Sequence, residues 1–420
     1  MRILYTGLIC LAAPLALAAT AWRGLRDPAY RERLGERLGF VRMRSPSPAI
    51  WVHAASVGEV QACAPLVRAL LERFPGQPVV VTTTTPTGAQ RVRALFGDQV
   101  AHCYLPYDTP GAVRRFLTRI RPQAAIVLER EIWPNLYLEC RRRGVPLAIA
   151  SARLSPRSVR RYRHMLGLLQ EALANVTVAA QTEDDAQRFL ALGAPAGRVH
   201  VTGNIKFDLE VPTAVAEAGR ALRAGQFPDR PVWIAASTHE GEEEIVLDAH
   251  QQVLARQPQA LLILVPRHPQ RFEQVRGRLL ARGIDSASRS RNEPVTATTR
   301  VLLVDTLGEL LMFYAAADVA LVAGSLAPIG GHNLLEPAAM GVPVLIGPHN
   351  FNAPEIARTF LQRGAARQVG SAAELAAQVA SLLADPLRRT AMSREGAAIL
   401  AENRGAVERV LGLVGPWISR

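Results

Sequence analysis

One lysine stands among the 49 lysine and arginine residues of this chain, and it is Lys206 in the sequence Thr-Gly-Asn-Ile-Lys-Phe-Asp (202–208). Arginine is a planar fork that grips anions at two points, whereas lysine is a compact point charge on a flexible stem. Two interpretations remain open: Lys206 places a charge where a guanidinium would not fit, or a single lysine survived by drift on a solvated surface. Gly203 and Asn204 predict a turn at the end of a strand, where functional groups often lie, and this favours the first.

Acidic residues follow two other apolar runs. Glu59 closes the sequence His-Ala-Ala-Ser-Val-Gly-Glu (53–59) and falls in the first turn of a predicted helix. The helix dipole keeps such a carboxylate ionised, so that Glu59 could act as a base; the alternative is that it only caps the helix. Glu129 and Glu131 flank Arg130 after a second run. We expect one of them to accept protons or hydrogen bonds and the other to pair with Arg130.

A glycine-rich block at residues 323–337 predicts an anion-binding loop. It contains Gly330 and Gly331, followed by a predicted helix start near His332–Asn333. Backbone N–H groups at a helix start bind anions, and glycines let a phosphate come close. Glu336, one turn further on, could accept hydrogen bonds from ribose hydroxyls. The block therefore favours a nucleotide or nucleotide-sugar site, with a purely structural turn as the alternative.

Two further strand ends carry possible nucleotide contacts. Arg267 and His268 lie between prolines after an apolar run, where Arg267 could bind a phosphate or carboxylate by two hydrogen bonds. Gly308, within residues 306–309, would allow a base or phosphate to approach. A solvated arginine and a simple helix-start turn are the respective alternatives. The motifs of P-loop nucleoside triphosphatases, zinc proteases and serine hydrolases are missing from the sequence, as is an Asp-x-Asp metal clamp.

The elements that must position these residues alternate between strand and helix. The first series of predicted strands is 50–54, 79–84, 124–128, 147–150, 176–180 and 199–202. After a segment rich in Ala, Gly, Pro and Arg at 211–230, a second series follows at 232–236, 260–265, 301–304, 319–323 and 342–346. Apolar strands between helices predict parallel sheets covered on both faces. We predict an α/β protein with two Rossmann-like domains facing across a cleft, at 25–210 and 211–420.

Composition narrows the class of protein. At 420 residues, the chain is too long for a single ordinary core. The net charge of +13 suits nucleic acid, a phosphorylated substrate or an anionic membrane, but only 5% of the residues are aromatic, and no basic stripe is interleaved with aromatics. We therefore expect no nucleic-acid partner. The four cysteines are widely spaced, which predicts neither a zinc site nor a disulfide framework.

The N-terminus predicts a membrane segment, residues 1–24. From Ile3 to Trp22 the chain carries no charge, which is long enough for a membrane-spanning helix. Seven arginines against three carboxylates follow between residues 23 and 44, and this bias places the body on the cytoplasmic side. The alternative is a cleaved signal peptide, because Ala16-Leu17-Ala18 is similar to a processing site.

Taken together, these motifs resemble the Kdo transferases, the 3-deoxy-D-manno-octulosonic acid transferases of lipopolysaccharide synthesis. The resemblance runs in order from the N-terminus to about residue 365. The segments that carry it are 53–59 (HAASVGE), 104–109 (YLPYDT), 129–135 (EREIWPN), 151–155 (SARLS), 202–208 (TGNIKFD), 266–271 (PRHPQR) and 330–336 (GGHNLLE). It implies a GT-B fold, CMP-Kdo as donor without a metal cofactor, the lipid A precursor lipid IVA as acceptor, and a place at the inner membrane.

The resemblance also implies roles for individual residues. Glu59 matches the base that deprotonates the acceptor hydroxyl, and Glu129 and Lys206 match positions that stabilise the transition state. The implied CMP contacts are Arg267, His268, Leu307, Gly308, Glu309, Asn333, Leu334, Leu335 and Glu336. The family usually has a small residue between the paired glutamates; Arg130 departs from this pattern and leaves its own direction and that of Glu131 open.

Two other functions remain as alternatives. One is a two-domain glycosyltransferase that uses a UDP-sugar on a lipid-linked acceptor. The other is an exported two-lobed binding protein whose first 20 residues are removed as a signal. Competition between cytidine and uridine donors separates the first from a Kdo transferase, and the intact mass of the native protein tests the second.

Overall fold

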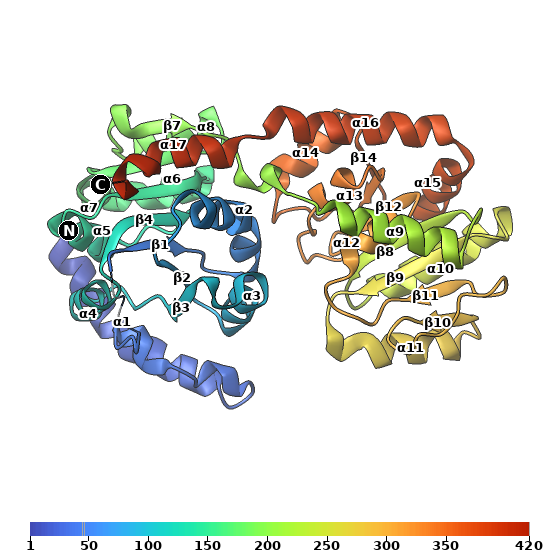
Figure 1. The fold of residues 1–420 in the computed structure, drawn as a ribbon, viewed down its shortest axis with the longest axis horizontal. Helices are drawn as coiled ribbons and strands as arrows, with labels where there is room; N and C mark the ends of the chain where they lie inside the picture. Colours follow the sequence, from blue (N-terminus) through green and yellow to red (C-terminus); the bar gives the residue numbers. More distant parts are fainter. Residues whose placement is uncertain (44, 46, 420) are drawn as a thin grey trace. The chain divides into compact units, whose positions relative to one another are not determined.

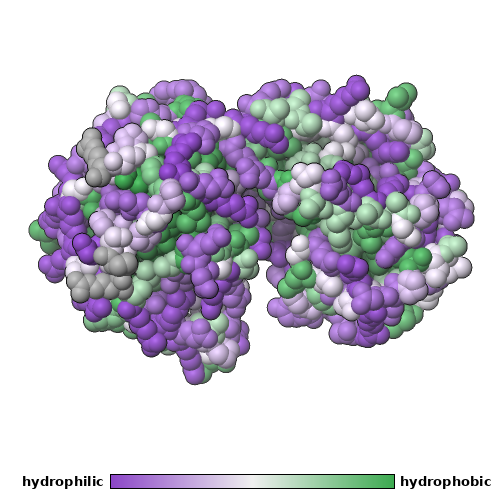
Figure 2. All heavy atoms as spheres, in the orientation of Figure 1, coloured by the Kyte–Doolittle hydropathy of each residue, from purple (hydrophilic) through white to green (hydrophobic). Residues whose placement is uncertain are grey.

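The computed structural model describes residues 1–43, 45 and 47–419 and divides into two compact units. Unit 1 comprises Met1–Asp208 together with the segment from Asn403 onward, and unit 2 comprises Leu209–Glu402. Each unit is built on a seven-stranded parallel sheet with helices against both faces (Figure 1). On the side drawn in Figure 2 the surface of each unit is mostly hydrophilic, because the strands keep their apolar side chains inside.

Unit 1 orders its strands β3-β2-β1-β4-β5-β6-β7. The strands are β1 (Ala49–His53), β2 (Val79–Thr83), β3 (Ala101–Tyr104), β4 (Pro122–Leu128), β5 (Leu147–Ala152), β6 (Val176–Ala180) and β7 (Val199–Val201). Its helices are α1 (Arg2–Arg23), α2 (Val57–Arg73), α3 (Pro86–Phe96), α4 (Pro110–Ile120), α5 (Pro134–Arg142), α6 (Pro156–Tyr162), α7 (Leu166–Leu173), α8 (Glu183–Ala191) and α17 (Ala406–Ile418). Alternate strand residues enter two separate apolar cores, one on each face of the sheet.

Unit 2 repeats this architecture with the order β10-β11-β9-β8-β12-β13-β14. The strands are β8 (Val232–Thr238), β9 (Leu261–Pro266), β10 (Ser286–Ser288), β11 (Val301–Leu303), β12 (Val319–Val322), β13 (Val344–Ile346) and β14 (Ala366–Gln368). The helices are α9 (Thr213–Gln226), α10 (Glu242–Arg256), α11 (Phe272–Ala281), α12 (Leu310–Ala315), α13 (Leu335–Ala339), α14 (Pro354–Gln362), α15 (Ala372–Ala384) and α16 (Pro386–Asn403). Two cores again line the two faces of the sheet.

Side-chain caps begin many of the helices that follow strands. In each case a hydroxyl oxygen accepts the backbone N–H three residues further on, which satisfies one of the unpaired donors of a helix start. The capping residues are Ser56, Thr85, Ser155, Thr182 and Ser371. These caps fix where the loop ends and the helix begins, and so they fix the strand-end loops in which the candidate residues lie.

The last helix departs from the expected domain boundary. Residues 403–419 pack on unit 1 instead of completing a second domain at 211–420. Helix α17 puts Val407, Val410, Leu411 and Val414 into the core that covers one face of the first sheet. Asp208 then accepts the N–H groups of Gly405 and Val407, each at 2.6 Å, and so holds the start of α17 at the end of the 202–208 segment.

Helix α1 is the one described helix that is long and apolar enough to cross a membrane. It also contacts the rest of unit 1 through polar side chains. Tyr5 donates to Asp108 at 2.8 Å, and the hydroxyls of Thr20 and Tyr107 are 3.1 Å apart. Ile3 and Leu11 are 90% and 75% exposed, so the other side of the helix presents apolar side chains outward.

Candidate active site

The strand order of each sheet brings two loops together at its carboxyl edge. In unit 1, β2 and β3 lie on one side of β1 and β4 lies on its other side, so the strand order reverses between β1 and β4. In unit 2 the same reversal lies between β8 and β12. Ligands of open parallel sheets bind in the crevice at such a reversal. In unit 1 the segment after β1 leads to Glu59, in the first turn of α2, and the segment after β4 carries Glu129; in unit 2 the segment after β12 is the 324–333 loop.

Glu59 lies in the first turn of α2 and has a capping contact. Its Oε2 accepts the backbone N–H of Ala55, and its own N–H donates to Ser56 Oγ at 3.4 Å. Among the described residues, its Oε1 makes no hydrogen bond or ion pair. Burial raises the pKa of Glu59, as do the nearby charges of Glu129 and Glu131. The capping alternative is therefore present in the structure, but one carboxylate oxygen stays available to take a proton.

Glu131 lies in the loop after β4, beside a buried histidine. Its Oε2 accepts from Trp133 Nε1 at 3.2 Å and is 3.9 Å from Nε2 of His53, the last residue of β1. Burial opposes ionisation of Glu131, but its contacts with His53 and Trp133 and the charge of Arg130 together outweigh burial and lower its pKa. Arg130 is exposed and makes no ion pair with either glutamate in the described chain, so the expected pairing with Arg130 was wrong.

Glu129 is buried between two cations. It is 3% exposed and sits at φ +58, which turns the chain sharply after β4. Its Oε1 accepts from Lys206 Nζ at 2.7 Å and its Oε2 from Arg153 Nε at 2.7 Å. Burial would raise the pKa of Glu129, but Lys206 and Arg153 outweigh burial and lower it. Lys206 is therefore not a lysine that survived by drift on a solvated surface, because its ammonium is one of two partners of a buried carboxylate.

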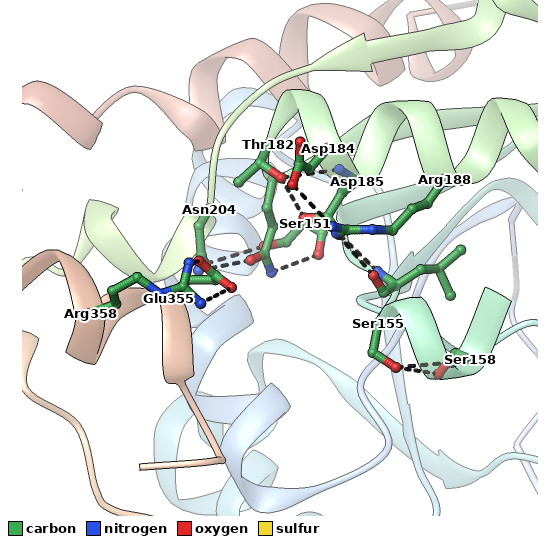
Figure 3. A network of polar contacts seen from close by, with 12 residues as sticks. Ser151, Ser155, Ser158, Thr182, Asp184, Asp185, Arg188, Asn204, Glu355 and Arg358 are labelled. Atoms are coloured by element: carbon green, nitrogen blue, oxygen red, sulfur yellow. Dashed lines mark hydrogen bonds and ion pairs between the residues drawn. The ribbon is translucent and has the colours of Figure 1, made fainter. Parts of the chain in front are cut away.

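The loop before Lys206 is held by a polar network. Asn204 Oδ1 accepts the Lys206 N–H at 3.0 Å. Ser151 Oγ donates to the same oxygen at 3.3 Å, and Figure 3 shows these two side chains. Gly203 has φ +85, and a side chain there would meet the guanidinium of Arg409 on α17. The turn predicted from Gly203 and Asn204 is present, and it fixes the backbone from which Lys206 reaches Glu129.

Arg153 is the partner of Glu129 that the sequence did not single out. Its loop is clamped to the start of α8: Asp185 Oδ1 accepts the Leu154 N–H at 2.9 Å, and Arg188 donates to the Leu154 carbonyl at 3.2 Å. Figure 3 shows Asp185, Arg188 and Thr182 in this network. Arg153 lies within the 151–155 segment of the family resemblance, and this was the one available signal.

In unit 2 the expected nucleotide contacts lie on three strand-end loops. Arg267 follows β9, is exposed and is held by its N–H, which donates to the Thr238 carbonyl at 2.9 Å. His268 is exposed beside His239, with ring centroids 5.1 Å apart. Partial burial lowers the pKa of His268, and the charge of Arg267 acts in the same direction. Both side chains are thus exposed and could meet an anion.

The 306–309 loop is tied down by its glutamate. Glu309 accepts from Arg289 at 2.7 Å and from the Thr306 hydroxyl, and the bond from Arg289 lowers the pKa of Glu309. Gly308 has φ +89 with open space where a side chain would be, and Leu307 is 67% exposed. The loop can therefore offer backbone and Leu307 to a ligand, while Glu309 holds its shape.

The 333–336 segment begins α13 two residues later than the sequence predicted. The side chain of Asn333 holds the start of this helix: Oδ1 accepts the Leu335 N–H at 3.1 Å, and Nδ2 donates to Glu336 at 3.2 Å. Leu334 and Leu335 are buried, so their side chains belong to the core and only their backbone could contact a ligand. Asn333 and Glu336 are half-buried and remain the side chains of this segment suited to binding.

A buried carboxylate that the sequence reasoning missed organises the glycine-rich loop. Glu242, at the start of α10, is fully buried and accepts four backbone N–H groups. The donors are His239, Gly324, Leu326 and Ala327. The signal available was the acidic run Glu242–Glu244 after a strand, which reads as an ordinary helix start. Glu242 joins the loops after β8 and β12.

Solved structures place this architecture in a known class. A glycosyltransferase from Rickettsia africae aligns with a TM-score of 0.57 at 11% identity, over 89% of this chain and 99% of that one. At this identity the likeness concerns the fold alone. The chain has the GT-B fold of two Rossmann-like units, as predicted.

Sequence relatives name the family. A family model described as 3-deoxy-D-manno-octulosonic-acid transferase (kdotransferase) matches residues 32–209. The 3-deoxy-D-manno-octulosonic acid transferase of Haemophilus influenzae is 43% identical over 100% of this chain and 99% of its own. That of Bordetella pertussis is 43% identical over 91% of each. The chain belongs to the Kdo transferase family and is a glycosyltransferase, which confirms the resemblance.

Proposed function

We propose that the chain transfers Kdo from CMP-Kdo to a hydroxyl of lipid IVA, with inversion at the sugar carbon and with Glu59 as general base. The observation that carries this proposal is the state of Glu59: its pKa is raised by burial and by two neighbouring carboxylates, while one of its oxygens remains available. A base works best when its pKa lies near the working pH. Membership of the Kdo transferase family identifies Kdo as the transferred sugar. The remaining steps of the proposal are argued from the chemistry of this chain's residues.

The proton and the bond exchange follow one path in this mechanism. Glu59 Oε1 takes the proton of the acceptor hydroxyl as the hydroxyl oxygen bonds to the Kdo carbon. The bond from that carbon to the phosphate oxygen breaks, and its electron pair leaves with CMP. Attack opposite the leaving group inverts the carbon. The N–H of Ala55 holds the carboxylate in place throughout, which keeps the cost of orienting it low.

Lys206 and Glu129 would stabilise charge in the transition state. As CMP leaves, the sugar gains positive character while its own carboxylate remains negative. The Lys206 ammonium, fixed by Glu129 and one-quarter exposed, can face an anionic group without a bound metal. Arg153 on the opposite oxygen keeps Glu129 ionised, so that Glu129 can hold the ammonium in a single position.

Unit 2 would hold the donor nucleotide. Arg267 and His268 suit its phosphate. The 307–309 loop and the backbone of Leu334 and Leu335 would contact CMP together with Asn333 and Glu336. Glu242 supports this assignment indirectly, because it fixes the glycine-rich loop with four hydrogen bonds and so prepares it before the donor arrives.

Helix α1 would hold the protein at the inner membrane, with the body on the cytoplasmic side. Its outward apolar side chains and the arginines that follow it fit an anionic bilayer surface, where each basic residue contributes about 1 kcal/mol. Lipid IVA is an acylated disaccharide phosphate embedded in that bilayer. An anchored enzyme therefore meets its acceptor at the surface where the acceptor resides.

The direct test is to incubate the full chain with lipid IVA and either CMP-Kdo or a UDP-sugar, and then to weigh the lipid product. We expect the product mass to rise by one or more Kdo residues with CMP-Kdo and to stay unchanged with UDP-sugars. A product formed only with UDP-sugars would contradict the proposed donor, CMP-Kdo. If lipid IVA stays unchanged while Kdo is transferred to another acceptor, the proposed acceptor is wrong.

A further inference from the structure

We propose that His239, paired with His332, is a phosphate-binding residue of the donor site and that the pair takes up a proton when the nucleotide phosphate binds. The proposal rests on the donor assignment above and adds a residue and a protonation step to it. His239 follows β8, His268 follows β9 and His332 lies in the loop after β12, so three neighbouring strand ends each bring an imidazole to the reversal point of the sheet.

The pair is defined by its geometry. The Nε2 atoms of His239 and His332 are 2.8 Å apart, and the two ring planes differ by only 6°. One ring must donate its N–H while the other accepts, so a single hydrogen lies between two nitrogens. The donating ring then keeps a lone pair on Nδ1. The pair can accept a further proton at that atom without losing its internal hydrogen bond.

The surroundings of the pair favour the neutral form until an anion arrives. Arg267, Arg271 and His268 face it from the loop after β9, and the carboxylate of Glu242 faces it from α10. Burial lowers the pKa of His332 to about 3 and also lowers the pKa of His239; the neighbouring cations act in the same direction, against Glu242. A phosphate beside an imidazole favours the charged form. Such a cluster is suited to gain a proton together with its ligand.

The backbone makes room for these two rings. Gly324 has φ +71, and a side chain there would come within 2.8 Å of His332 and 3.7 Å of His239. Glu242 accepts the N–H groups of both His239 and Gly324 and so fixes the loops that carry the pair. Within residues 1–43, 45 and 47–419, no group of three or more His, Cys, Asp or Glu is placed to hold a metal ion.

A charged imidazole would act on the reaction as well as on binding. CMP-Kdo carries one negative charge on its phosphodiester, whereas departing CMP becomes a phosphate monoester that gains a second. A cation at the phosphate therefore stabilises the leaving group more than the bound donor, which is the condition for accelerating a reaction. The proton comes from solvent and remains on the imidazole, so that no further reactant is needed.

The test is calorimetric titration of the full chain with CMP at about pH 7.5, where a phosphate monoester is mostly a dianion, in two buffers of different ionisation enthalpy. The variants are His239→Gln and His332→Gln, with His200→Gln as a matched control, because His200 is exposed on the edge strand β7 of unit 1. Cytidine, which lacks the phosphate, is titrated in parallel. Thermal denaturation of each variant checks that it is folded.

We expect the wild type and His200→Gln to take up protons on binding CMP. His239→Gln should take up fewer and should bind CMP roughly 10- to 100-fold more weakly, as expected for a lost hydrogen bond to a charged group, while cytidine binds as before. Unchanged CMP affinity and proton uptake in His239→Gln would overturn the proposal, and so would an equal loss for CMP and cytidine. Failure of the wild type to bind CMP would instead contradict the donor assignment.

Discussion

Lys206 and its partner Glu129 allow the proposed catalytic role to be separated from simple charge neutralisation. Replacing Lys206 by Met keeps the length of the side chain and removes the ammonium, which leaves Glu129 with one cation, Arg153. Replacing Glu129 by Gln removes the buried charge itself. If Lys206 only neutralises Glu129, the double variant should recover what Lys206→Met loses. If Lys206 acts on the reacting sugar, the double variant should stay as slow as Lys206→Met.

The structure sets the sizes of these effects. Removing one partner of a fully buried ion pair costs about 3–5 kcal/mol. Lys206 is one-quarter exposed and Arg153 remains, so we expect about 1–2 kcal/mol for Lys206→Met. In a unit of this size this corresponds to a fall of about 2–8 °C in the thermal midpoint. The loss in kcat should be larger, about 10²- to 10³-fold, as for other electrostatic contacts made in a transition state.

The assay is kcat with CMP-Kdo and lipid IVA, beside the thermal midpoint, for both single variants and the double variant. Arg73 and Glu408 form an exposed ion pair in the same unit, and the variants Arg73→Met and Glu408→Gln serve as a control cycle with a coupling below about 1 kcal/mol. Recovery of kcat in the Lys206→Met/Glu129→Gln variant would refute the catalytic role. Wild-type kcat in Lys206→Arg, for which we expect a severe loss, would refute the need for an ammonium.

Other predictions concern the carboxylates. Because Glu59 must be ionised to take a proton and its pKa is raised, activity should be lost as the pH falls through a value above that of an ordinary glutamate; a pH–rate profile measures this. Glu131→Gln removes one of the charges that raise this pKa, so the acid limb should move to lower pH, and an unmoved limb would contradict the assignment. Glu242→Gln leaves one oxygen for four N–H donors and should cost about 2–4 kcal/mol in thermal unfolding and weaken CMP binding, whereas Glu355→Gln in an exposed pair should change little.

The sequence predicted the interior strands better than the edges of the sheets. It missed β3, β10 and β14, and each of these lies at the edge of its sheet. Interior strands are covered on both sides and read as continuous apolar runs, whereas the sequences of the missed strands, Ala-His-Cys-Tyr, Ser-Ala-Ser and Ala-Arg-Gln, contain polar or small residues. A strand of only three or four such residues has the same sequence pattern as a loop, so the pattern cannot distinguish the two.

Long-range contacts were also beyond the reach of sequence pattern. Helix α17 has an apolar face, but nothing in its sequence says that the face covers the first sheet and not the second. The side chain of Arg153 reads as one arginine among many, and only the fold brings it within 2.7 Å of Glu129. Glu242 looked like a helix-start acid, yet its four N–H donors come from two separate loops.

Strand ends were the signal from which the candidate site was predicted. Glu59, Glu129 and Lys206 were each singled out because a polar residue followed an apolar run, and parallel strands collect such residues at one edge. The structure brings Glu129 and Lys206 into direct contact, and the charge of Glu129 raises the pKa of Glu59. Leu334 and Leu335 show the limit of reasoning from motifs, because a motif position can be buried and can then offer only its backbone.

The measurement that tests the central claim most directly is the single-turnover rate of Glu59→Gln with CMP-Kdo and lipid IVA, taken beside its affinity for CMP. Glutamine keeps the size of the side chain but cannot take the proton. We predict a rate about 10²- to 10⁴-fold below wild type with unchanged CMP affinity, which is the usual contribution of a general base. A rate near that of wild type would contradict the account.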